Sequence, residues 1–173
     1  MKILLSPPEL FITLQRLAHE LVERHDLFED VAIIGIQPRG VALSDRLVAI
    51  VKNITGNENL LYGQLDITFH RDDIHSGAAL QKPSENNIPF SVEGRTVILI
   101  DDVLHTGRTV RSAMDALMAY GRPSRIELLT LIDRKFSREL PVQSDYTGRS
   151  IDTVMSQKVM VEWEPEQRVL LID

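Results

Sequence analysis

Two adjacent acids and a glycine-containing turn follow one apolar run of the chain. Residues 97–100 (VILI) lead directly into Asp101 and Asp102, and the turn at residues 106–109 (TGRT) follows after three residues. A stretch with helical spacing begins there. Glycine lets a backbone approach a ligand closely, and the free N–H groups of a helix N-terminus favour an anion. The pattern predicts a buried strand that ends in a carboxylate pair and continues into a phosphate-binding loop.

A carboxylate pair beside a phosphate site needs an explanation, because carboxylates and phosphates repel each other. A sugar between them resolves this, since carboxylates accept hydrogen bonds from a ribose diol while the 5′-phosphate lies on the turn. Carboxylates also stabilise the positive charge that develops on a sugar ring when the bond at its anomeric carbon breaks. The spacings of the Walker A motif and of the dinucleotide-binding fingerprint are absent. The acid pair alone also fits a loop cap or half of a metal site, but its context favours a phosphorylated ribose.

The composition is that of a single soluble domain. The 173 residues can bury a sizeable core, and 43% are hydrophobic and 25% charged. A net charge of −6 argues against a surface that binds nucleic acid throughout, although it allows a local basic patch. The absence of cysteine fits a reducing cytoplasm. Pro7 and Pro8 interrupt the first apolar run too early for a signal peptide, and no stretch approaches the roughly 20 apolar residues of a membrane helix, so we expect a cytoplasmic protein.

Strands and helices are predicted to alternate along the chain. A capping box at Ser6, with proline at the first helical position, begins a helix that runs to about residue 22. Runs typical of strands recur at residues 31–36, 60–69, 97–100 and 125–133. Helical spacing follows two of these runs, at residues 41–53 and 110–118. Parallel neighbours need crossover helices, so this order predicts an α/β fold with a parallel sheet.

Three irregular regions complete the prediction. Residues 37–40 (QPRG) place an arginine and a glycine where α/β folds bind ligands, although a tight turn without a ligand looks the same. Residues 74–91 are polar and aperiodic, which predicts a mobile flap over about residues 71–91, hinged near Arg71. Four short β-prone segments predict small antiparallel strands, either a cap over the site or a sheet edge, at residues 140–142, 146–148, 159–161 and 169–172.

The segment VILIDDVLHTGRT resembles the phosphoribosyl pyrophosphate (PRPP) motif of type I phosphoribosyltransferases. The segments RLAHELVER, GIQPRG, DITFHRDD, GRPSRIEL, RELPVQSDYTGRSI and QKVMVEW occur in the order seen in one group of that family, the pyrimidine-operon regulators that are also uracil phosphoribosyltransferases. The resemblance covers nearly the whole chain and implies one domain over residues 1–173. The implied fold is a central, mostly parallel sheet flanked by helices, with a mobile flap and a small β-rich hood mainly at residues 134–164.

The resemblance also implies a reaction, in which uracil and PRPP give UMP and pyrophosphate. Asp101 and Asp102 would hold the ribose hydroxyls and, together with Arg71, would be catalytic. The motif residues around the 5′-phosphate would be Val103, Leu104, His105, Thr106, Gly107, Arg108 and Thr109. The pyrophosphate loop would comprise Pro38, Arg39 and Gly40, and the uracil pocket would include Arg134 and Val159. Mg²⁺ would arrive bound to PRPP, held mostly by ligand oxygens and water rather than by a protein metal site.

Three positions depart from the family pattern. Pro38 stands where the family often has threonine, and His105 replaces the usual tyrosine. The loop at residues 134–138 (RKFSR) is one residue longer than its family counterpart and borders the expected base site.

The family's second role is binding of the pyrimidine-operon leader mRNA in response to uridine nucleotides, which promotes transcription attenuation. The basic face for RNA would include Arg16, His19, Arg138 and Arg149, although the first two also fit a solvated helix face. The resemblance implies a homo-oligomer, a dimer or higher. Two alternatives stay open, a nucleotide-sensing RNA-binding attenuator with vestigial catalysis and a phosphoribosyltransferase for another base.

Overall fold

Five parallel strands form the central sheet, in the spatial order β3-β2-β4-β5-β6. The structure is a computed structural model and describes residues 1–72 and 86–173. The strands in chain order are β2 (Val31–Ile36), β3 (Leu61–Leu65), β4 (Thr96–Leu104), β5 (Arg125–Lys135) and β6 (Tyr146–Asp152). The predicted α/β fold with a parallel sheet is confirmed, because helices connect β2 to β3 and β4 to β5.

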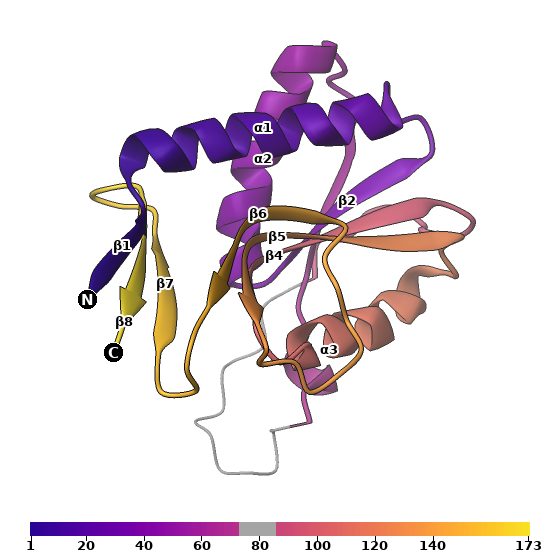
Figure 1. Cartoon of the computed structure of the whole chain (residues 1–173). Helices are drawn as coiled ribbons and strands as arrows, with labels where there is room; N and C mark the ends of the chain where they lie inside the picture. Colours follow the sequence, from indigo (N-terminus) through magenta and orange to yellow (C-terminus); the bar gives the residue numbers. More distant parts are fainter. Residues whose placement is uncertain (73–85) are drawn as a thin grey trace.

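Helices cover both faces of this sheet (Figure 1). The helices α1 (Pro7–His25) and α2 (Arg39–Thr55) lie on one face, and α3 (Arg108–Leu117) lies on the other. Side chains of β2 alternate between two apolar cores, because Ile33 packs in the core of α1 and α2 while Ile34 packs in the core of α3. This double burial explains why the strands read as continuous apolar runs in the sequence.

The capping box predicted at Ser6 begins α1. The Ser6 backbone N–H donates to Glu9 Oε2 at 2.8 Å, and the Ser6 hydroxyl donates to the same oxygen at 2.6 Å. Proline occupies the first helical position, where its missing N–H costs no hydrogen bond. The start of α1 is therefore set by local sequence alone.

A second, antiparallel sheet joins the two ends of the chain (Figure 1). Its strands are β1 (Lys2–Leu5), β8 (Arg168–Ile172) and β7 (Lys158–Glu162), in that order across the sheet. The antiparallel prediction is confirmed for β7 and β8, but β1 was not foreseen. The antiparallel prediction is wrong for residues 140–142, which form no strand, and for residues 146–148, which belong to β6 and pair in parallel with β5 at the edge of the central sheet. The side chain of Tyr146 is fully buried there, which fixes this strand to the main core.

Short 3-10 turns, η1 (Thr68–His70) and η3 (Met118–Tyr120), complete the described elements. The strand predicted for residues 60–69 is shorter than expected, because Asp66 Oδ1 accepts hydrogen bonds from the Thr68 backbone and hydroxyl and starts η1. Most of the predicted flap falls on residues 73–85, which lie outside the described residues, so its mobility stays a prediction. None of the described helices has the length and apolarity that crossing a bilayer requires.

Candidate active site

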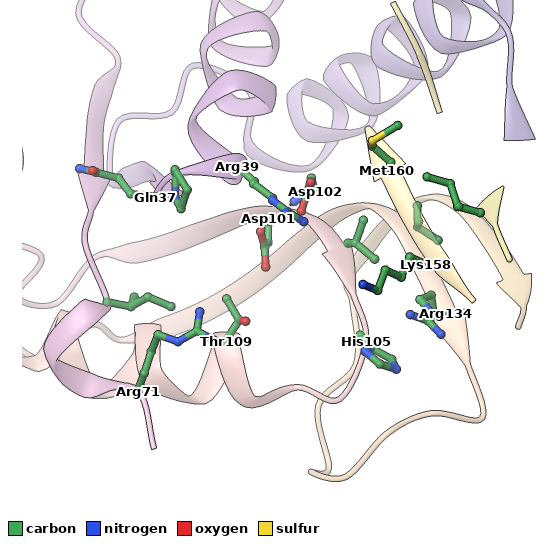
Figure 2. A pocket seen from close by; sticks show the side chains of 15 residues that line it. Gln37, Arg39, Arg71, Asp101, Asp102, His105, Thr109, Arg134, Lys158 and Met160 are labelled. Carbon is green, nitrogen blue, oxygen red and sulfur yellow. Dashed lines mark hydrogen bonds between the residues drawn. The ribbon is translucent and has the colours of Figure 1, made fainter. Parts of the chain in front are cut away.

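A cavity of about 540 Å³ opens at the carboxyl ends of β2, β4 and β5 (Figure 2). Parallel strands bring their carboxyl ends to one edge of a sheet, where α/β folds bind ligands. Gln37 and Arg71 lie toward one end of the cavity, Arg39 lies beside Asp101 and Asp102 near its middle, and Arg134 lies toward the other end. Most residues predicted to bind substrate line this cavity, namely Pro38, Arg39, Arg71, Asp101, Asp102, Val103, His105, Thr109, Arg134 and Val159.

The acid pair is almost fully removed from solvent. Asp101 is 7% and Asp102 6% exposed, and Asp101 Oδ1 accepts a hydrogen bond of 2.9 Å from the Asp102 backbone N–H. Burial, with the negative charge of Asp102, raises the pKa of Asp101 to about 8. Burial also raises the pKa of Asp102, and the Arg39 guanidinium opposes that rise. The ligand-free pair therefore retains a proton at neutral pH, and a positive charge placed beside it would favour loss of that proton.

The predicted phosphate turn lies at the N-terminus of α3. Gly107 has φ = 93°, a left-handed conformation that side chains rarely adopt, and α3 begins at the next residue. The Thr106 carbonyl accepts hydrogen bonds from the backbone N–H groups of Glu139 and Leu140, at 2.9 and 3.1 Å. A smaller hollow of about 200 Å³ lies beside the turn and is lined by Arg71, Thr106, Arg108 and Thr109, among others. The helix N-terminus and the hollow together suit a phosphate group.

Three predicted site residues hold the site in shape, Arg108 through ion pairs and Leu104 and Gly40 through packing. The Arg108 side chain binds Asp72 Oδ2 at 2.5 Å and Glu139 Oε2 at 2.6 Å, which anchors the turn on both sides. Leu104 is 1% exposed and packs in the core of α3. Gly40 permits close packing, because a side-chain carbon there would clash with the Ile100 carbonyl oxygen of β4.

The base end of the cavity is built from β5 and β7. Arg134 is 4% exposed, and its guanidinium donates to Thr153 Oγ1 at 2.9 Å and to the Val154 carbonyl at 3.2 Å. Lys158 and Met160 line the cavity here as well, and sequence reasoning missed both (Figure 2). The sequence could have indicated both residues, because they flank Val159 in one strand. Gln37 was also missed, although it adjoins the predicted pyrophosphate loop.

The four basic residues predicted to face RNA lie in different settings. Arg16 donates to the carbonyls of Thr147 and Gly148 at 3.0 and 2.7 Å from the exposed face of α1, and His19 Nδ1 contacts the Gln15 carbonyl at 2.8 Å.

The other two candidates hold loops and chain ends in place. Arg149 donates to the Leu4 carbonyl of β1. The Arg138 guanidinium contacts Asp133 and donates to carbonyl oxygens that surround the phosphate turn, those of Leu104, His105, Arg134 and Val142. Arg138 is thus a structural part of the site.

Comparison with known proteins defines the class to which this fold and site belong. A family model described as a phosphoribosyl transferase domain matches residues 1–166. Among solved structures, the hypoxanthine phosphoribosyltransferase of Trypanosoma cruzi is 14% identical with a TM-score of 0.73, and the match covers 99% of this chain and 95% of that chain. A hypoxanthine phosphoribosyltransferase from Staphylococcus aureus is 20% identical with a TM-score of 0.67, over 87% of this chain and 77% of that chain. The predicted type I phosphoribosyltransferase fold is confirmed.

Curated relatives narrow the assignment. The bifunctional protein PyrR of Elusimicrobium minutum is 44% identical over 174 residues, which cover 99% of this chain and 96% of the relative. The bifunctional protein PyrR of Bacillus pumilus is 46% identical over 151 residues, which cover 86% of this chain and 83% of the relative. The chain belongs to this PyrR family of phosphoribosyl transferases.

Proposed function

We propose that the protein transfers the 5-phosphoribosyl group from PRPP to uracil, which gives UMP and pyrophosphate. One observation carries the proposal: a buried acid pair with Arg39 beside it lies midway along a single cavity, between an end lined by Gln37 and Arg71 and an end formed by β5 and β7. This arrangement places a sugar at the acids, a leaving group on one side and an attacking base on the other. The in-line geometry suits displacement at the anomeric carbon.

The ribose and its phosphate are held by the end of β4 and the start of α3. Asp101 and Asp102 accept hydrogen bonds from the ribose hydroxyls, and the turn at residues 106–109 binds the 5′-phosphate through backbone N–H groups. As the bond to pyrophosphate breaks, positive charge develops on the ring. The buried carboxylates stabilise this charge more strongly than water would, because they are fixed in position and poorly solvated.

The leaving pyrophosphate occupies the end of the cavity lined by Gln37 and Arg71, within reach of Arg39 beside the acid pair. Guanidinium groups stabilise the charge that accumulates on its oxygens. Within the described part of the chain, no group of three or more His, Asp or Glu side chains gathers to hold a metal ion. The two acids and the open cavity fit Mg²⁺ that enters bound to PRPP and keeps most of its oxygen ligands. Such an ion would supply further charge neutralisation at the pyrophosphate.

The pyrimidine occupies the base end of the cavity. Arg134 is held in place by its bonds to residues 153 and 154, so its position is set before substrate binds. The edge of β7 at Val159 offers backbone groups to the base, and Lys158 adds a donor for a carbonyl oxygen. We further expect a cytoplasmic homo-oligomer, a dimer or higher.

Conversion of labelled uracil to UMP in the presence of PRPP and Mg²⁺ tests this proposal. We expect turnover that depends on PRPP and exceeds turnover with hypoxanthine or guanine. A preference for a purine would instead assign the protein to another base. If no base is turned over, the remaining assignment is a nucleotide-binding regulator with vestigial catalysis.

We also propose a second role, regulation of pyrimidine-operon expression by binding leader mRNA and promoting attenuation. The support is the name of the relatives, which are described as bifunctional, and the exposed face of α1 that presents Arg16 and His19. Titration of leader RNA with and without UMP tests it. We expect UMP to strengthen binding and added salt to weaken it, because phosphate contacts release counterions. Absent or salt-insensitive binding would contradict this role.

A further inference from the structure

The imidazole of His105 lines the base end of the cavity, one residue beyond β4 (Figure 2). Its Nε2 atom is covered by protein and has no hydrogen-bond partner within residues 1–72 and 86–173. Because Nε2 faces protein, the half-buried ring meets a ligand in the cavity through its other edge, which carries Nδ1. Neither the family pattern nor the proposed contacts to ribose and phosphate account for this side chain.

The surroundings of His105 set its charge. Burial, together with the positive charge of Arg134 on β5, lowers the pKa of His105. Arg138 acts in the same direction and Glu139 opposes it, both from the loop after β5. Lys158 of β7 also lines this end of the cavity. The ring is therefore neutral at neutral pH and has a lone pair that can accept a proton.

The proposed reaction requires such an acceptor. The attacking nitrogen of a pyrimidine carries a proton that must leave as the nitrogen bonds to carbon. Arginine and lysine side chains, which keep their protons at neutral pH, supply the other charges around the base end. Asp101 and Asp102 lie at the middle of the cavity, where the ribose would be. Among the described titratable groups at the base end, His105 is the one suited to accept the proton.

We propose that His105 is a catalytic residue, the general base that accepts the proton from the attacking nitrogen of the pyrimidine. This inference rests on the proposed transferase function. The bond between the base nitrogen and C1′ of the ribose forms, and the bond from C1′ to the pyrophosphate oxygen breaks with its electron pair leaving on pyrophosphate. The proton of the base nitrogen moves to the imidazole and then to solvent.

The pH dependence of kcat, measured with saturating PRPP and uracil, tests the proposal. Wild-type kcat should fall at acidic pH as the imidazole becomes protonated, and the midpoint should lie below the usual histidine value. His105→Asn should lower kcat on the order of 100-fold, within the range expected for a general base, and should remove this acidic limb. Any pH dependence that arises from Asp101 and Asp102 should remain in both proteins. A variant that keeps the wild-type kcat and its acidic limb would overturn the proposal.

A second substrate separates proton transfer from a structural effect. The fluorine of 5-fluorouracil withdraws electrons and makes the attacking N–H more acidic, so its reaction depends less on a base. The loss caused by His105→Asn should therefore be clearly smaller with 5-fluorouracil than with uracil. Equal losses for both substrates would indicate a structural role and overturn the proposal.

Thermal unfolding would show whether His105→Asn folds. If it does not, the pH dependence of the wild-type protein decides the question. Its acidic limb should be shallower with 5-fluorouracil than with uracil, and the absence of any limb with uracil would overturn the role of His105 alone. A wild-type protein that turns over neither pyrimidine would overturn the proposed function itself, and this inference with it.

Discussion

Asp101 and Asp102 are adjacent in sequence but have different surroundings. Burial raises the pKa of both, while Arg39 opposes the rise at Asp102. We predict that Asp102→Asn lowers kcat on the order of 100-fold or more and changes PRPP affinity much less, because its charge matters most when the ring becomes positive. Steady-state kinetics and equilibrium PRPP binding measure the two effects. Asp115→Asn, on the exposed surface of α3, serves as a matched control. Comparable losses in kcat and affinity would contradict this role.

The raised pKa of Asp101 also predicts how the stability of the folded protein depends on pH. Its pKa is raised to about 8, well above the value of an unfolded aspartate, so between these two values the folded protein binds more protons than the unfolded chain. This group therefore makes the free energy of unfolding fall as pH rises from about 4 to 8. Asp101→Asn imitates the protonated acid and should flatten that decline. Urea unfolding of ligand-free protein at several pH values checks this, and parallel curves for the two proteins would disprove it.

At the scale of elements, the turn between β4 and α3 determines whether the 5′-phosphate of PRPP binds. A valine at Gly107 would be strained at φ = 93°, and its Cβ would lie 3.3 Å from Val142. We predict that Gly107→Val abolishes measurable PRPP binding while the fold persists. Gly56→Val is a matched control, because Gly56 also has a positive φ, 68°, but ends α2 with open space around it. Calorimetric binding to both variants, with unfolding curves, distinguishes local strain from loss of the site. Unchanged PRPP affinity in Gly107→Val would show that the phosphate binds elsewhere.

A buried polar cluster fixes the edge strand β6 to the rest of the sheet. The Tyr146 hydroxyl donates to Glu127 Oε2 at 2.6 Å, and His25 Nε2 lies 2.8 Å from the same oxygen. Tyr146→Phe leaves Glu127 without this donor, so we predict a loss of about 1–3 kcal/mol in the free energy of unfolding. Tyr120→Phe, at a half-buried tyrosine of η3, should cost less. Urea unfolding measures both, and equal costs would show that the cluster contributes little.

The same cluster predicts an effect at acidic pH. Burial alone would raise the pKa of Glu127, but hydrogen bonds from Tyr146 and His25 outweigh it and lower the pKa. A lowered carboxyl pKa stabilises the fold above its unfolded value, and this stabilisation is lost as pH falls through the folded value. In Tyr146→Phe the pKa of Glu127 should be lowered less. The loss of stability that Glu127 causes at acidic pH should therefore be smaller. Urea unfolding between about pH 3 and 6, the range in which a glutamate titrates, would test this, and an unchanged acid slope would contradict it.

Elements that are specified by neighbouring residues in the chain could be predicted from the sequence. The capping box of α1 and the apolar runs of β2, β4 and β5 depend on nearby residues. The bounds of β2 and β5 were predicted closely, whereas β4 continues to Leu104, four residues beyond the predicted run. The strand β1 was missed because its partner, β8, lies at the opposite end of the chain. The parallel pairing of β6 was missed because it depends on the buried contact between Tyr146 and Glu127. Pairing between distant segments has no signature in a short window of sequence.

At the scale of the whole molecule, the candidate site combines one continuous motif with scattered contributions. Residues 97–109 supply the acids and the turn, which is why the sequence indicated a phosphorylated ribose. Lys158 and Met160 reach the cavity only because the second sheet packs beside the carboxyl ends of the first. Arg138, for which RNA contact stays a prediction, donates to carbonyl oxygens around the phosphate turn. Side-chain type alone did not reveal that an arginine is occupied within the fold.

A crystal structure of the protein with UMP bound would test the central claim most directly. We predict that the 5′-phosphate lies on the turn at residues 106–109, and that the ribose hydroxyls bond to Asp101 and Asp102. The pyrimidine should extend toward Arg134 and Lys158, with His105 at its edge. A phosphate bound away from the turn, or a ribose without contact to either acid, would contradict the assignment of this cavity as the transferase site.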